Sequence, residues 1–421
     1  MVNAKILIPT HTLLKGRIQL STSKSESNRA LMIRAYGGFD RLITQLSDAE
    51  DTQLLKANLK QIKECSQSAI PLVIDCGNAG TVFRFLLTYL ATLSGKWMLT
   101  GSGRMQERPV GELVESLRSL GADISYTGKE GFAPLRIHGK MLIGGQTAVD
   151  ISRSSQFASS LLLAAPQWEN GLILQLGGSQ SSLPYIEMTI VLMRHFGADV
   201  KQQNDKIIVE PVPYKNVGIR IHPDWSAASY WYEMMALSKG GELVLDHLSL
   251  DSLQGDKVIA QLFEQLGVQT HQEPDGVRIF QQGEVVSAFE CDLRHHPDLL
   301  PALAVSCAGL GITAKFTGLD NLVHKESNRL LALKTELLKL EVFFQEIEKG
   351  SYILKPNKKL PVFDASKPLL INCWADHRIA MAFAPLALKV GALQLDDPDV
   401  VAKSYPAFWS MMRKTGLFNQ G

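Results

Sequence analysis

The feature that most constrains the fold of this chain is a repeated pattern, in which an amphipathic helix ends in Leu-Gly or Phe-Gly and a short apolar strand follows at once. The pattern occurs with glycines about 70 residues apart, at 113–124 with Gly121, at 190–200 with Gly197, and at 258–268 with Gly267. Glycine is favoured directly after a helix because it adopts a positive φ without steric cost. A further copy at 333–342 has Glu341 in place of the glycine, and 51–64 has the helical part of an earlier one.

Units of about 70 residues fit roughly six times into the 421 residues of the chain, and each is long enough for a small βαβ-type subdomain. Helix, glycine and strand also recur in any α/β protein, but the shared Gly-Ala-Asp at 121–123 and 197–199 favours a true repeat. We therefore expect an α/β protein built from repeated subdomains. Candidate boundaries in the middle of the chain are the polar turn at 211–213 and the stretch 222–226.

The composition is that of an ordinary folded protein. The chain has 43 Lys and Arg against 42 Asp and Glu, so it has no global attraction to nucleic acid or membrane surfaces, and any cationic site must be local. Five scattered cysteines without a Cys-x-x-Cys pair support neither a disulfide framework nor a zinc site. Residues 1–14 lack the apolar core of a targeting signal, and no segment reaches the ~18 apolar residues of a membrane helix. We expect a cytoplasmic protein.

Basic and hydroxyl side chains gather where helices are expected to begin. Lys24 and Arg29 follow serines that can cap a helix near residue 24, and 75–84 reads as a strand, a glycine turn around Gly80 and a helix. A helix start with nearby cations is a suitable seat for carboxylate or phosphate. Each block by itself also has an ordinary structural explanation. The first could be a solvated basic helix start, and the second a common glycine turn before a helix.

Three more blocks have the same character. Arg108 precedes Pro109, which we expect in the first turn of a helix. The hydroxyl and amide groups of 154–156 precede an apolar helix, as do Ser182 and Tyr185. Such neutral groups can hold a polyol or a phosphate.

The block 321–329 is the most informative, because Glu326 to Arg329 repeat the order Glu-Ser-Asn-Arg of 26–29, each with a lysine just upstream. This repetition suggests two basic blocks that face one anionic ligand. Asp298 follows two histidines, but no third block has the spacing of a metal ligand, so we expect no metal. Arg378 and Lys403 are two further cations at element boundaries.

Taken in order, these motifs resemble the 5-enolpyruvylshikimate-3-phosphate (EPSP) synthase family, the enolpyruvyl transferases of the shikimate pathway. The matching motifs cover essentially all of the chain: 23–31, 77–84, 107–111, 154–157, 224–230, 252–256, 297–298, 325–330, 376–381 and 402–406. The resemblance implies an α/β (α+β), inverse α/β barrel-like fold of two domains, each built from three repeated βαβαββ subdomains. It also implies domains at 1–19 plus 224–421 and at 20–223, with the active site in the cleft between them.

The resemblance further implies two small-molecule substrates and no cofactor. Contacts to shikimate 3-phosphate fall on Lys24, Ser25, Arg29, Ser154, Ser155, Gln156, Ser182, Tyr185, Asp298, Asn321 and Lys325. Contacts to phosphoenolpyruvate fall on Lys24, Asn78, Gly80, Thr81, Arg108, Gln156, Arg329, Arg378 and Lys403.

The implied reaction transfers the enolpyruvyl (carboxyvinyl) group of phosphoenolpyruvate to the 5-hydroxyl of shikimate 3-phosphate and releases phosphate. Such chemistry needs an acid above the methylene carbon and a base at the hydroxyl. Glu326 is the candidate acid, and Asp298 is the candidate base, assisted by Lys24 and Lys325. We also expect a monomer, and inhibition by glyphosate through the open turn at Gly80.

Two departures from the family pattern stand out: Asn328 replaces a frequent Asp, and Arg153 replaces small or apolar residues, which would place an extra cation near the phosphate site. Two alternatives remain at this point. One is an enolpyruvyl transferase of the same fold that acts on a UDP-sugar, which would be expected to carry a reactive loop cysteine. The other is a non-catalytic member that binds anionic metabolites.

Overall fold

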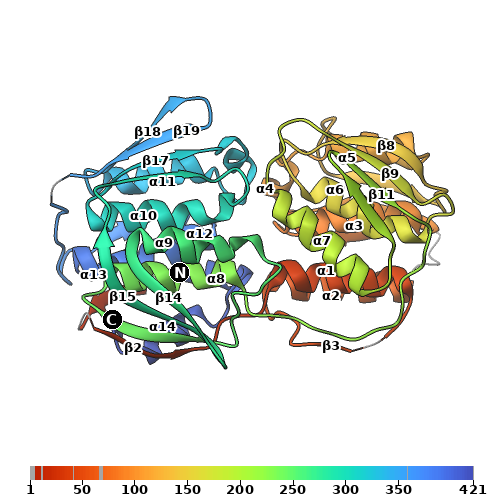
Figure 1. Ribbon diagram of the computed structural model, residues 1–421. Helices are drawn as coiled ribbons and strands as arrows, with labels where there is room; N and C mark the ends of the chain where they lie inside the picture. The colour runs from red at the N-terminus through yellow and green to blue at the C-terminus, as the bar shows by residue number, and fades with distance from the viewer. Residues whose placement is uncertain (1–4, 11–12, 41, 66–69, 358, 421) are drawn as a thin grey trace. The chain divides into compact units, whose positions relative to one another are not determined.

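The computed structural model describes residues 5–10, 13–40, 42–65, 70–357 and 359–420. The expectations for residues 1–14 and for Cys65 therefore lie partly outside the described residues and side chains. Contacts between Cα atoms divide the chain into two compact units, which we call unit 1 (Met1–Thr22 with His222–Gly421) and unit 2 (Ser23–Ile221). The amino-terminal segment thus completes the unit that holds the carboxy-terminal half (Figure 1).

Unit 1 contains three four-stranded sheets among its described residues. Their strands, in sheet order, are β2 (Leu14–Ile18), β13 (Gly241–Asp246), β15 (Gly276–Val285) and β14 (Leu266–Glu273); β16 (Ala288–Asp292), β17 (Thr313–Thr317), β19 (Ser351–Lys355) and β18 (Phe343–Glu348); and β20 (Leu369–Ile371), β21 (Leu393–Leu395), β1 (Lys5–Pro9) and β22 (Phe418–Gln420). Its α-helices are α8 (Trp225–Leu237), α9 (Ile259–Glu264), α10 (Leu300–Leu310), α11 (Arg329–Leu338), α12 (His377–Phe383), α13 (Ala387–Val390) and α14 (Phe408–Lys414).

Unit 2 contains two four-stranded sheets and one two-stranded sheet among its described residues. In sheet order the strands are β4 (Leu72–Asp75), β5 (Gly95–Thr100), β7 (Leu135–Gly139) and β6 (Asp123–Tyr126); β8 (Gly145–Asp150), β9 (Leu172–Gly177), β11 (Lys206–Val209) and β10 (Val200–Gln203); and β3 (Ile43–Thr44) with β12 (Ile219–Arg220). Its α-helices are α1 (Lys24–Gly37), α2 (Glu50–Cys65), α3 (Gly80–Thr92), α4 (Gly103–Gln106), α5 (Gly111–Ser119), α6 (Gln156–Ala164) and α7 (Leu183–His195).

The four-stranded sheets share one plan. In the sheet of β4 to β7, β4 and β5 are parallel, β5 pairs antiparallel with β7, and β7 pairs antiparallel with β6. The sheet of β8 to β11 has the same pairing, with α6 and α7 in the positions of α3 and α5. The prediction of repeated βαβαββ subdomains is therefore confirmed.

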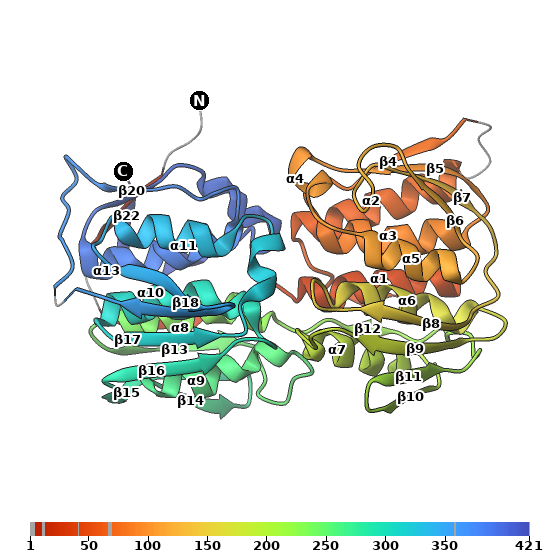
Figure 2. The ribbon, with the colours of Figure 1, turned by 90° about the horizontal axis from the view of Figure 1, so that it is seen from above.

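Helices lie inside each unit and sheets lie outside (Figure 2). In α8 every residue from Ala227 to Leu237 is buried, and in α10 every residue from Leu300 to Ala308 is buried. A helix that is buried on nearly all sides is mostly apolar, as these two are, although α8 also buries Glu233. The alternating burial of β8, in contrast, shows a strand with one face to solvent. The sequence thus encodes buried helices that are covered by sheets with one face toward solvent.

The repeated glycines behave as expected at two of three positions. Gly121 and Gly197 follow α5 and α7 with φ of 94° and 87°, and Glu341 adopts a φ of 58° at the corresponding place after α11. The prediction for Gly267 was wrong, because α9 already ends at Glu264 and Gly267 lies within β14. Its positive φ serves a shift in strand pairing between Leu266 and Val268. Within the described residues, no helix is long and apolar enough to cross a membrane.

Candidate active site

Arg329 is the centre of the candidate site in unit 1. It is the first residue of α11, and its side chain is 1% exposed. The guanidinium donates to Asp298 Oδ1 at 2.8 Å, Glu326 Oε2 at 2.7 Å and Asp376 Oδ2 at 2.8 Å. One buried cation therefore gathers three carboxylates from segments far apart in the sequence.

Asp298 lies in a short 3-10 helix (Pro297–Leu299) and connects Arg329 with two further cations. Arg378 donates to its Oδ2 at 2.8 Å, and Lys325 Nζ lies 3.4 Å from its Oδ1. Burial opposes ionisation of Asp298, but Arg378, Lys325 and Arg329 outweigh it and hold the pKa of this carboxyl well below its usual range. Burial likewise lowers the pKa of Lys325, although Asp298 partly offsets this effect. Asp298 is thus an ionised carboxylate that binds cations.

The remaining predicted residues of unit 1 lie on elements that adjoin this cluster. Asn321 is buried in the 3-10 helix Asp320–His324, which packs against α11. Lys403 is buried in the 3-10 helix Pro398–Lys403, which packs against α12. Asn328 is the N-cap of α11, and its side-chain oxygen accepts a hydrogen bond from the Leu331 N–H at 3.1 Å. Asn and Asp cap helices about equally well, so this departure keeps the start of α11 intact.

In unit 2, α1 begins at Lys24 as predicted, with Ser23 as the N-cap. Lys24 Nζ lies 3.0 Å from Asp51 Oδ2 at the start of α2. Arg29 is 2% exposed and donates to Ser25 O at 2.9 Å and Tyr185 O at 3.0 Å. Burial lowers the pKa of Arg29 to about 10. The structure thus brings Ser25, Arg29 and Tyr185 together at the ends of α1 and α7.

The glycine turn after β4 lies against Arg108. Arg108 is 4% exposed and donates to the backbone oxygen of Asn78 at 3.3 Å. A methyl group on Gly80 would lie 2.5 Å from Arg108 Nη2 and 2.6 Å from Arg84 Nη1, so only glycine leaves both guanidiniums where they are. The prediction that Pro109 lies in the first turn of a helix was wrong, since α4 ends at Gln106 and α5 begins at Gly111.

The hydroxyl and amide block joins the glycine turn. Gln156, the first residue of α6, donates to Thr81 Oγ1 at 2.8 Å and accepts from Arg84 Nη1 at 2.7 Å. Arg84 also donates to Pro109 O at 3.4 Å. Ser154 Oγ accepts the Gln156 N–H at 3.2 Å, and Ser155 is buried. Three segments that are distant in the sequence thus meet around Arg84.

Ser182 has a strained backbone at the start of α7. It is the N-cap residue of α7, is 5% exposed, and has a φ of 58° in the left-handed region. A non-glycine residue in this conformation is often associated with a functional site.

Sequence reasoning missed three residues that organise these clusters: Arg84, which links Gln156 to Pro109, Asp51, which pairs with Lys24, and Asp376, which binds Arg329. Asp376 could have been predicted as a helix cap, because Asp is a common N-cap residue. The structure shows it as the N-cap of α12, where its side chain accepts the Arg378 N–H. The partners of Arg84 and Asp51 lie too far away in the sequence to be inferred from spacing.

Cys76, Cys291, Cys307 and Cys373 are free thiols, and burial raises the pKa of each. A cysteine that acts as an acid or nucleophile needs a lowered pKa and solvent access. None of these four thiols has that character, which disfavours the chemistry expected of the UDP-sugar alternative.

The fold and the clusters together define a class of protein: an α/β protein of repeated subdomains in which buried arginine, lysine and carboxylate side chains gather, an arrangement typical of enzymes that bind multiply charged anions. A family model described as EPSP synthase (3-phosphoshikimate 1-carboxyvinyltransferase) matches residues 8–412. The chain belongs to this family, so the resemblance seen in the sequence is confirmed.

Individual relatives agree with the family match. The 3-phosphoshikimate 1-carboxyvinyltransferase of Bacteroides fragilis is 41% identical over 414 residues, which is 98% of each chain. The enzyme of the same name from Syntrophobacter fumaroxidans is 34% identical over 420 residues, covering 95% of this chain and 97% of that one. The solved structure of EPSP synthase from Acinetobacter baumannii has a TM-score of 0.77 at 23% identity over 99% of both chains, which supports the fold.

Proposed function

We propose that the protein transfers the enolpyruvyl group of phosphoenolpyruvate to the 5-hydroxyl of shikimate 3-phosphate, with the residues above as its active site. The observation that carries the assignment of residues is the buried Arg329, which binds Asp298 and Glu326 at 2.8 and 2.7 Å. The reaction needs cations for a phosphate and a carboxylate, and two carboxylates for proton transfer. This cluster supports both requirements.

The reaction proceeds by addition and elimination. The 5-hydroxyl oxygen bonds to C2 of phosphoenolpyruvate while C3 takes a proton and becomes a methyl group, which gives a tetrahedral intermediate. The C2–O bond to phosphate then breaks, and a proton leaves the methyl group to restore the double bond. Glu326 gives and later takes the proton at C3, and Asp298 takes the hydroxyl proton, assisted by Lys24 and Lys325. Arginine and lysine side chains stabilise the phosphate as it leaves.

Asp298 becomes a better base when the substrates bind. Its low pKa depends on Arg378, Lys325 and Arg329, while burial acts in the opposite direction. A phosphate or carboxylate that engages Arg329 and Arg378 competes for these cations, so the pKa of Asp298 rises as the substrate arrives. The carboxylate then has the basicity needed to accept the hydroxyl proton.

The remaining contacts complete the two substrate sites. Shikimate 3-phosphate is held by cations, neutral polar groups and one carboxylate: Lys24, Ser25, Arg29, Ser154, Ser155, Gln156, Ser182, Tyr185, Asp298, Asn321 and Lys325. Phosphoenolpyruvate is held by Lys24, Asn78, Gly80, Thr81, Arg108, Gln156, Arg329, Arg378 and Lys403. The protein acts as a cytoplasmic monomer, and the free thiols of its four described cysteines agree with a reducing compartment.

The decisive experiment measures inorganic phosphate released from phosphoenolpyruvate by the purified protein. Release is expected only when shikimate 3-phosphate is also present, with equal amounts of phosphate and enolpyruvyl product. A UDP-sugar in place of shikimate 3-phosphate serves as the matched control and should give no release. A folded protein that releases no phosphate with either acceptor would support the non-catalytic alternative.

A further inference from the structure

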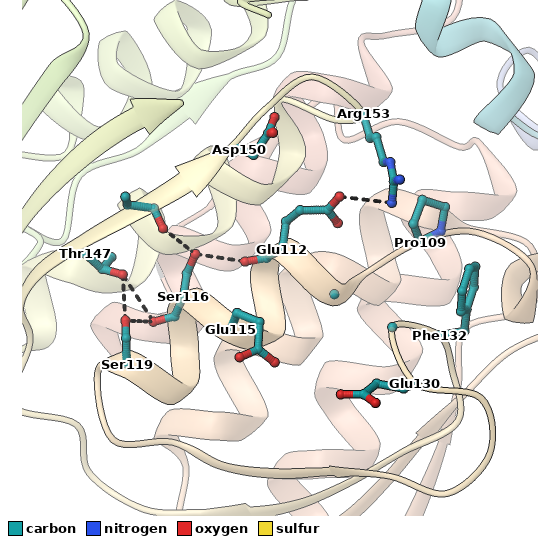
Figure 3. A pocket seen from close by; sticks show the side chains of 13 residues that line it. Pro109, Glu112, Glu115, Ser116, Ser119, Glu130, Phe132, Thr147, Asp150 and Arg153 are labelled. Atoms are coloured by element: carbon teal, nitrogen blue, oxygen red, sulfur yellow. Dashed lines mark hydrogen bonds and ion pairs between the residues drawn. The ribbon is translucent and has the colours of Figure 1, made fainter. Parts of the chain in front are cut away.

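Arg153 and Glu112 form an ion pair that joins two segments of the candidate site. Nη1 of Arg153 lies 3.1 Å from Oε1 of Glu112, and their side chains are 51% and 23% exposed. Figure 3 shows the two side chains reaching toward each other from the turn after β8 and from the first turn of α5. The pair therefore connects two separate elements and is not an ion pair within one helix.

Each partner lies beside residues assigned to a substrate. Arg153 directly precedes Ser154, Ser155 and Gln156. Glu112 is the second residue of α5 and follows Arg108 by four positions. The ion pair thus connects the segment with shikimate 3-phosphate contacts to the segment that bears a phosphoenolpyruvate contact.

The same two segments are already joined on their buried side. Arg84 donates to Gln156 Oε1 at 2.7 Å and to Pro109 O at 3.4 Å. The Arg153–Glu112 pair repeats this connection on the solvent side, where both residues line a cavity of about 650 Å³. There the ion pair adds a charged contact to the packing of α5 against β8 and α6.

Neighbouring contacts fix β8 and shape the turn that follows it. Ser116 of α5 donates to Ala148 O at 2.7 Å (Figure 3). Asp150 Oδ1 accepts the Ser152 N–H at 2.7 Å, which shapes the turn. Arg153 then adds an ion pair from this turn to Glu112 of α5.

We propose that Arg153 and Glu112 are positioning residues, whose ion pair keeps the Arg108 segment and the Ser154–Gln156 segment aligned for both substrates. This inference rests on the proposed function, because it takes its meaning from the substrates those segments hold. It replaces the sequence-based expectation that Arg153 is an extra cation for the phosphate of the substrate, since the guanidinium is turned to Glu112.

The kinetic test compares Arg153→Ala, Glu112→Gln, the double variant, and the charge swap of Arg153→Glu with Glu112→Arg. Each single variant should raise KM for both substrates about two- to five-fold, as expected for a half-exposed pair, with kcat nearly unchanged. The double variant should be no worse than either single one, and the swap should recover part of the loss. A rise in KM for shikimate 3-phosphate with Arg153→Ala alone would instead mean direct contact with the phosphate, and would overturn the proposal.

Hydrogen exchange of the backbone amides gives a second test that does not need activity. Both single variants should speed exchange in the peptides covering 107–113 and 150–157, because each segment loses its partner in the other. The matched control is Lys201→Ala, which removes an exposed ion pair between β10 and Glu210, the residue after β11, and should leave both peptides unchanged. Faster exchange only in the mutated segment would refute the positioning role even in an active enzyme. If either variant speeds exchange in both peptides but the natural protein has no transferase activity, the positioning role stands and the proposed function is refuted.

Discussion

Arg329 and Asp376 form a buried ion pair at the centre of unit 1, with Nε of Arg329 2.8 Å from Oδ2 of Asp376 and side chains that are 1% and 0% exposed. Asp376 also accepts hydrogen bonds from the Ser327 hydroxyl and from the backbone N–H of Arg378, both at 3.0 Å. One carboxylate therefore fixes two of the three arginines that are assigned to phosphoenolpyruvate, Arg329 and Arg378. Asp376 thus caps α12 and also holds the Arg329 side chain in place.

Asp376→Asn should destabilise the protein and weaken binding of phosphoenolpyruvate. Removal of one partner of a buried pair typically costs about 3–5 kcal/mol, because a charge is left without compensation. Asn keeps the shape and the capping oxygen, so the expected loss is at the low end of this range, and urea unfolding measures it. Asp246→Asn is the control: its partner Arg17 is 51% exposed, so the change should be below ~1 kcal/mol. Equal losses in the two variants would contradict the central role of Asp376.

Gly80→Ala should raise KM for phosphoenolpyruvate at least about ten-fold while the protein stays folded, since a lost arginine contact of ~1.4 kcal/mol corresponds to this factor. The added methyl group would lie 2.5 Å from Arg108 Nη2, so this guanidinium must move. Inhibition by glyphosate, expected in the micromolar range for the natural protein, should weaken in parallel. Gly103→Ala is the control, because its methyl group would meet no atom within 4 Å. An unchanged KM in Gly80→Ala would show that Arg108 does not bind this substrate.

Glu326→Gln should lower kcat by about 10²-fold or more, the usual contribution of a general acid or base, with far smaller changes in substrate affinity. Gln can still accept the hydrogen bond that Arg329 donates to Glu326 at 2.7 Å, but it cannot deliver a proton to C3. Steady-state kinetics and equilibrium binding separate the two effects. Incorporation of deuterium from heavy water at C3 of recovered phosphoenolpyruvate should also disappear. Equal losses in kcat and affinity would assign Glu326 a purely structural role.

Asp298→Asn should destabilise the protein in a way that depends on pH. The folded-state pKa of Asp298 is depressed, so the stabilisation is fully present above the unfolded pKa of about 3.9 and is lost as the pH falls through the lower folded value. The difference in urea midpoint between the natural protein and the variant should therefore be the same at neutral and mildly acidic pH. It should shrink only below about pH 4. A difference that shrinks at higher pH would mean that the three cations do not hold the carboxylate in its ionised form.

The sequence by itself determined the repeated architecture and the family. Helix, glycine and strand periodicity are local properties, because each glycine marks a helix end through its own φ, as at Gly121 and Gly197. Gly267 shows the limit of this reasoning: a positive φ is equally suited to a bulge in a strand, and the local sequence does not distinguish the two. Motif order likewise indicated which residues carry charge, but not which of them meet.

Only the tertiary structure decided the partners. Arg329 contacts Asp298 and Asp376, which are 31 and 47 positions away, and Arg84 contacts Gln156, 72 positions away. The partner of Arg153 was decided in the same way, since its neighbour Ser154 suggested a phosphate whereas the fold supplies Glu112 at 3.1 Å. Electrostatic pairing depends on distance in space, and the packing of β-strands and helices fixes that distance.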